Sequence, residues 1–186
     1  MTSKLIDVLG EEHQGFQAML SVLAALASRV SSRGAVPPTM VADIIDFFQL
    51  FTDRHHALEE QVLFPALAKH GVSRDQTVVN ALLAQHDAGR MYCRKMHADQ
   101  QRMSQGDDSA ADDFAAHALC YCELIREHIR IEDEYFYGLA VELLTEAELQ
   151  SVLNEFSSRG GGAAHPQRAR FLRMLEEFPA IAASWQ

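Results

Sequence analysis

A His-x-x-x-Glu pair occurs twice in this sequence, and the repeat restricts the fold more than any other feature. His56 is followed four positions later by Glu60, and His128 is followed in the same way by Glu132. On an α-helix, residues four apart lie on one face, so each pair directs an imidazole and a carboxylate toward one place. The sequence therefore predicts two helices that bring metal-binding side chains together.

Four long segments have apolar residues at three- and four-residue spacing, which is typical of helices. They run from about 3 to 32, from 39 to 70, from 73 to 104 and from just after 108 to 138. Sustained alternation of β-branched residues is missing, so the pattern gives no strand signal. Because short loops between long helices favour antiparallel neighbours, we predict an all-α, up-down-up-down antiparallel four-helix bundle.

The C-terminal segment, residues 141–186, predicts two extra helices. The first begins with the capping box of Thr145 and Glu148, and the second begins near Pro166. We therefore divide the chain into a metal-binding bundle, residues 1–140, and accessory helices that pack on it.

Counting from the predicted turns places one histidine of each long helix at the same height. His13 and His56 lie 22 and 21 residues from the turn near position 35. His56 and His86 lie 16 and 14 residues from the turn near position 72, and His86 and His128 each lie 21 residues from the turn near position 107. The largest mismatch corresponds to about 3 Å along a helix, which side chains can span. The predicted metal ligands are His13, His56, Glu60, His86, His128 and Glu132.

These motifs resemble the hemerythrin-like (HHE cation-binding) family. The segments HHALEEQVLFPAL with HG, QHDAGR and REHIRIEDEYFY are similar to the signatures of its second, third and fourth helices, and the similarity covers about residues 10–140. The resemblance implies a four-helix bundle with a non-haem di-iron centre. It implies that the four histidines are terminal ligands and that Glu60 and Glu132 bridge or cap two iron ions, although zinc or manganese would bind the same groups.

The sequence differs from the oxygen-carrying hemerythrins at two positions. The carriers have a second histidine one turn after the first on the third helix, where this chain has Arg90. Their fourth-helix carboxylate is an aspartate five residues after the histidine, which is Asp133 here, but we favour Glu132 because it repeats the first pair's spacing. The missing nitrogen leaves room for water, for Glu59 or for an exogenous molecule, and it argues against simple reversible oxygen carriage. A ligand role for Glu59 or Asp133 stays open.

Other residues near the pattern are expected to lie outside the ligand set. His55 is about 100° around the helix from His56, so we expect it to be exposed or to contact a ligand from outside. His97 and His117 should face one another about 16 Å from the metal layer, most simply as a polar pair. The aromatic residues that we expect in the core are Phe47, Phe48, Phe51, Phe64 and Tyr121.

Composition excludes two classes of partner. The net charge of −10 argues against nucleic acids and against anionic membrane surfaces, because both need a basic face. No apolar segment reaches the length of a signal peptide or a membrane span, so we expect a cytoplasmic protein with Cys93, Cys120 and Cys122 reduced. A protein partner or a second copy of the chain stays open.

The leading hypothesis is a non-haem di-iron protein that binds or senses dioxygen, nitric oxide or peroxide. One alternative is a di-iron oxidase or an enzyme that metabolises peroxide or nitric oxide, which needs an open metal position. Another is a structural or iron-storage metal site. The sequence leaves open whether the protein is an enzyme and identifies no catalytic residue.

Overall fold

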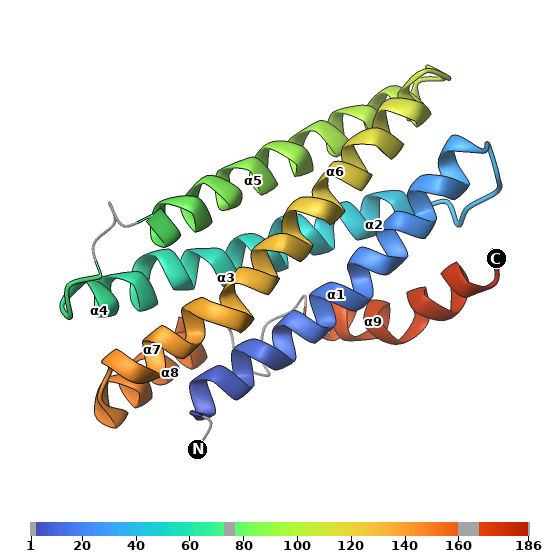
Figure 1. Ribbon diagram of the computed structural model, residues 1–186. Helices are drawn as coiled ribbons and strands as arrows, with labels where there is room; N and C mark the ends of the chain where they lie inside the picture. The colour runs from blue at the N-terminus through green and yellow to red at the C-terminus, as the bar shows by residue number, and fades with distance from the viewer. Residues whose placement is uncertain (1–2, 73–76, 160–167, 186) are drawn as a thin grey trace.

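The computed structural model describes residues 3–72, 77–159 and 168–185, and this part of the chain is helical without strands, as the sequence predicts. Four helical rods lie side by side, and consecutive rods run in opposite directions (Figure 1). The second rod is continuous over residues 40–68 and is called rod 2. The fourth, over residues 110–143, is called rod 4. The first rod is α1 (Lys4–Ser31), and the third is α5 (Thr77–Ser104). Rod 2 contains α2 (Met40–Phe47), α3 (Asp53–Leu58) and α4 (Phe64–Ala68), and rod 4 contains α6 (Ala110–Ile131) and α7 (Tyr137–Leu143). Two further helices follow, α8 (Glu146–Arg159) and α9 (Arg168–Ala183).

Short π-helical segments interrupt rods 2 and 4. Rod 2 contains Phe48–Thr52 and Glu59–Leu63, and rod 4 contains Glu132–Phe136. In a π turn the backbone N–H donates to the carbonyl five residues earlier instead of four, and such turns are frequent at functional sites. Pro65 lies in the first turn of α4 just after a π segment. Its missing N–H costs least there, so rod 2 continues to residue 68.

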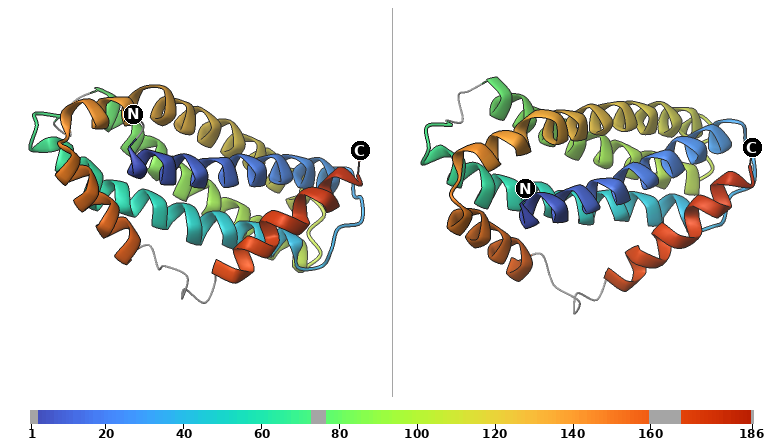
Figure 2. Two further views of the ribbon diagram at one scale, coloured as in Figure 1. Left: turned by 90° about the horizontal axis from the view of Figure 1, so that it is seen from below. Right: turned by 60° about the horizontal axis from the view of Figure 1, so that its bottom comes forward.

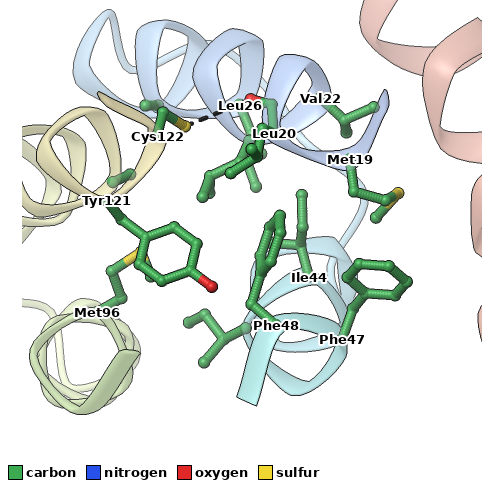
Figure 3. Packing of buried hydrophobic residues seen from close by; sticks show 14 of the residues in the cluster. Met19, Leu20, Val22, Leu26, Ile44, Phe47, Phe48, Met96, Tyr121 and Cys122 are labelled. Carbon is green, nitrogen blue, oxygen red and sulfur yellow. Dashed lines mark hydrogen bonds between the residues drawn. The ribbon is translucent and has the colours of Figure 1, made fainter. Parts of the chain in front are cut away.

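The apolar core consists of two clusters. The buried side chains between them form what we call the polar layer, which consists of His13, His55, His56, Glu59, His86, His128 and Glu132. One cluster includes Phe16 and Phe114 and lies toward the end of the rods where α1 meets α2. The other includes Leu9 and Phe136 and lies toward the opposite end. Figure 3 shows the first cluster, where Tyr121 packs against Phe48 with ring centroids 5.0 Å apart. The residues between the clusters are therefore shielded from water on both sides.

The expected aromatic core is confirmed where the structure describes the side chains. Phe47, Phe48, Phe64 and Tyr121 are all buried. The side chain of Phe51 lies outside the described residues. No helix in residues 3–72, 77–159 and 168–185 is both long enough and apolar enough to cross a bilayer.

The two C-terminal helices lie on the same side of the rods, one toward each end (Figure 2). α8 contacts α1 and rod 2, and α9 contacts α1. The predicted capping box at the start of α8 is present, because Thr145 N–H donates to Glu148 Oε2 over 2.9 Å and Glu148 N–H donates to Thr145 Oγ1 over 3.3 Å. The predicted helix start near Pro166 lies outside the described residues.

We expect the contact of α9 to stabilise the bundle through Phe171. This side chain is 4% exposed, and its ring meets the Phe47 ring edge-on with centroids 5.5 Å apart. Phe171→Ala should lower the free energy of unfolding by about 3–5 kcal/mol, because it removes a buried ring. The neighbouring Leu172 is 48% exposed, so Leu172→Ala is the matched control and should change it by less than about 0.5 kcal/mol. Chemical denaturation measures both, and equal effects would contradict the packing described.

The three free cysteines should differ in reactivity. Burial raises the pKa of Cys93 to about 12 and that of Cys122 to about 12, whereas Cys120 is exposed. Because the thiolate is the reactive form, the folded protein at pH 8 should show one fast thiol per chain toward a chromogenic disulfide reagent. Unfolding should expose all three, and Cys120→Ser should remove the fast phase. A fast phase that survives this substitution would contradict the prediction.

Candidate metal centre

Five histidines and two glutamates from α1, rod 2, α5 and rod 4 meet in the polar layer. Each is at most 3% exposed. They form two groups, and within each group one donor atom per residue lies within 4.8 Å of the others. Group 1 contains His56, Glu59, His86 and His128, and group 2 contains His13, His55 and Glu132.

The two carboxylates connect the groups. Glu59 Oε1 lies 3.5 Å from His55 Nε2, and its Oε2 lies 3.6 Å from His86 Nε2. Glu132 Oε2 lies 3.3 Å from His13 Nε2 and 3.2 Å from His128 Nε2. Each glutamate therefore contacts one histidine of each group, which is where a carboxylate would have to lie to bind two cations.

Four of the five imidazoles are held from outside through Nδ1. His13 contacts Asp133 Oδ1 at 2.8 Å, His55 contacts Glu12 Oε2 at 2.7 Å, His86 contacts Glu60 Oε1 at 2.8 Å, and His128 contacts Gln85 Oε1 at 3.2 Å. An acceptor at Nδ1 favours the tautomer that carries its proton there. The inward Nε2 atom then keeps its lone pair, as a metal-binding histidine requires.

Several inward-facing atoms have no hydrogen-bond partner. A buried polar atom without a partner costs about 1–3 kcal/mol, so such atoms are rare in folded proteins. In the described part of the chain they gather at this layer, with Thr52 Oγ1 as the one exception. The atoms at the layer are Glu59 Oε2, His86 Nε2, His128 Nε2 and Glu132 Oε1. All four are lone-pair donors, so cations fit this site better than any further side chain would.

The charges of the layer also favour cations. Burial raises the pKa of Glu132, but His128 and His13 outweigh it and hold the pKa well below the usual value. Burial lowers the pKa of His56, and His86 and His128 lower it further. Glu132 is therefore ionised while His56 is neutral, which are the protonation states that metal ligands need. Burial lowers the pKa of His13 and of His55, but the neighbouring carboxylates outweigh it and raise both, so these two imidazoles would release a proton when a cation binds.

The structure brings five of the six predicted ligands into the two groups and places the sixth, Glu60, outside them. The Glu60 side chain is 25% exposed. It accepts hydrogen bonds from His86 Nδ1 at 2.8 Å and from Arg90 at 3.1 Å. Glu60 therefore holds His86 from outside the groups, and Glu59 takes the inward place. The five that the groups contain are His13, His56, His86, His128 and Glu132.

The sequence analysis misses His55, which is 2% exposed and belongs to group 2. The expectation of an exposed side chain is wrong because the direction into the bundle passes between His55 and His56, so each points to a different group. Glu59 lies four residues after His55 and three after His56, and both spacings keep it on the same helix face as these histidines. The spacing of His55 and Glu59 is the signal that could have identified them.

The expected pair of His97 and His117 is not what the structure shows. His97 is exposed, and His117 Nδ1 contacts Asp99 Oδ2 at 2.7 Å. Asp99 is only 4% exposed and also accepts a hydrogen bond from Arg102. This cluster joins α5 to α6 away from the two groups.

A small cavity lies beside group 1. It has a volume of about 170 Å³. One of its walls is Phe64, whose ring stacks on His86 with centroids 6.1 Å apart and an interplanar angle of 16°. The lining is largely apolar and consists of Glu60, Phe64, Pro65, Ala68, Val72, Val79 and Leu83.

Comparisons with known proteins agree with this geometry. The profile of the family described as "Hemerythrin HHE cation binding domain" matches residues 4–140. Uncharacterized proteins of Mycobacterium bovis and of two strains of Mycobacterium tuberculosis are each 24% identical to this chain over 149 residues. The alignment covers 80% of this chain and 58% of each relative, so the chain spans less than two thirds of their length. No solved structure matches the chain.

Substitution of the two adjacent glutamates should separate a ligand from its support. Glu59→Gln should lower the number of metal ions bound per chain, because it removes the charge of a carboxylate that contacts both groups. Glu60→Gln is the matched control. It should keep the stoichiometry and weaken affinity by about 10- to 100-fold, as loss of an outer hydrogen bond to a ligand does. Elemental analysis after dialysis measures both, and the opposite ranking would show that Glu60 is the ligand.

Proposed function

This chain belongs to the hemerythrin HHE cation-binding domain family, and from that premise we propose that its two groups hold a pair of iron ions that bind or sense dioxygen, nitric oxide or peroxide. The observation that carries the proposal is the set of four unpartnered donor atoms in the buried layer. A sealed apolar interior would not retain these atoms without a cation. The opposite directions of consecutive rods support the up-down-up-down bundle that such a centre needs.

Each group offers its own set of donors to one ion. Group 1 presents the imidazoles of His56, His86 and His128, group 2 presents those of His13 and His55, and the two glutamates contact both groups. Mixed nitrogen and oxygen ligation suits iron, and zinc and manganese accept the same donors. Bound iron would supply a redox-active Lewis acid for small oxygen- and nitrogen-containing molecules.

The surrounding side chains favour a small ligand over a large substrate. The apolar clusters on both sides of the layer exclude bulk water from the groups. The cavity of about 170 Å³ behind Phe64 and Glu60 has room for a diatomic molecule or peroxide. These features support the binding or sensing of a small molecule.

Iron content and the visible spectrum test this proposal. Protein purified without chelators should contain about two irons per chain, one for each group. Oxidation by air, followed by azide, should add charge-transfer bands, because an exogenous anion binds at an open metal position. Zinc in place of iron, or a spectrum that azide does not change, would contradict the proposal. Rapid consumption of peroxide or nitric oxide by the same sample would favour the enzymatic alternative over sensing.

A further inference from the structure

The hydroxyl group of Tyr137 contacts two residues of group 2, His13 and Glu132, and the neighbouring Glu59. The side chain is 1% exposed, and its oxygen donates to Glu59 Oε1 over 2.8 Å. The same oxygen lies 3.3 Å from His13 Nε2 and 3.4 Å from Glu132 Oε2. A phenol that was buried only for packing would not need three atoms of metal-binding type, one imidazole nitrogen and two carboxylate oxygens, around its oxygen.

The π turn of rod 4 directs Tyr137 toward the layer. Its N–H donates to the carbonyl of Glu132, five residues earlier. In a regular α-helix a residue five positions on is rotated by about 140°, whereas the wider π turn returns it to nearly the same face. Rod 2 repeats this arrangement, because Phe64 N–H donates to the carbonyl of Glu59. Each carboxylate is thus followed by an aromatic residue at the layer, and only the one in rod 4 has a donor oxygen.

The distances around the phenol oxygen match those between ligands of one metal ion. With metal–ligand bonds of about 2.0–2.2 Å, donors at tetrahedral or octahedral corners are about 2.8–3.6 Å apart. His13 Nε2 lies 3.3 Å from His55 Nε2 and 3.3 Å from Glu132 Oε2. The contacts of the Tyr137 oxygen, 2.8 to 3.4 Å, fall in the same range. The oxygen therefore stands where a further corner of the group 2 polyhedron would lie.

Group 2 also has fewer nitrogen donors than group 1, with two imidazoles against three. We propose that Tyr137 is a ligand of the ion in group 2 and binds it through the phenol oxygen. This inference rests on the proposed function. The oxygen–metal bond replaces the O–H bond, the proton leaves to water, and no oxidation state changes.

The surroundings of Tyr137 explain why a cation is needed for this bond. The phenol oxygen lies against the carboxylates of Glu59 and Glu132, so it can lose its proton here only when a cation takes the proton's place. The hydrogen bond to Glu59 and the metal bond are thus alternative partners of the same oxygen.

The test uses the full chain loaded with ferric iron. A phenolate bound to ferric iron gives an intense visible charge-transfer band, and excitation in that band enhances phenolate ring vibrations in resonance Raman spectra. Tyr137→Phe keeps the ring and should lose both signals while iron remains bound. Tyr121→Phe alters another fully buried tyrosine, one in the apolar cluster beside Phe48, and should keep both signals.

A second measurement does not depend on the folding of a variant. Wild-type protein with ring-deuterated tyrosine should show shifted phenolate vibrations if a tyrosine binds the iron. Iron-loaded wild-type protein without these vibrations, or an unchanged spectrum in Tyr137→Phe, would overturn the inference and leave the proposed function intact. Wild-type protein that takes up no iron would overturn both.

Discussion

The buried layer of carboxylates and imidazoles is the constraint on which the rest of the structure depends. Placing Glu59 and Glu132 at full burial between two apolar clusters is costly unless opposite charges and hydrogen bonds compensate. The outer nitrogens of four of the five histidines have acceptors, whereas four inward-facing atoms have no hydrogen-bond partner. The fold therefore holds the imidazoles through hydrogen bonds to their outer nitrogens and leaves the inward-facing lone pairs free for cations. Loss of the outer hydrogen bonds and loss of cations would therefore disturb the same side chains.

The π turns show how the helices accommodate this layer. Glu59 and Glu132 each begin a π segment, and each segment is followed by an aromatic residue that contacts the layer, Phe64 or Tyr137. A π turn has poorer local packing than an α turn, so it persists where it orients side chains that a regular helix cannot. Here it places a carboxylate and the aromatic residue five positions later on one face. Pro65 follows the turn in rod 2 at a point that needs no N–H.

The sequence was sufficient for the helices and for the height of the histidines, because apolar periodicity and turn positions are local properties. It was not sufficient to decide which of two adjacent residues points into the bundle. His55 and Glu59 have the same spacing as His56 and Glu60, and the choice depends on the rotation of rod 2 about its axis. The π turns set that rotation, and they leave no mark in apolar periodicity. For the same reason the sequence predicts a missing nitrogen donor at Arg90, whereas His55 of rod 2 adds an imidazole to group 2.

The two halves of the centre differ in ways that assign them different tasks. Group 1 has three imidazoles and adjoins the apolar cavity through Phe64. In group 2, His13 and His55 each have a carboxylate on their outer nitrogen, and carboxylates at that position strengthen imidazole as a donor. With the phenol oxygen that we propose as a further ligand, group 2 would hold an ion of higher charge more firmly than group 1 would. Group 1 is the half nearer to the cavity, because Phe64 both lines the cavity and stacks on His86. We therefore expect a small ligand to bind at group 1.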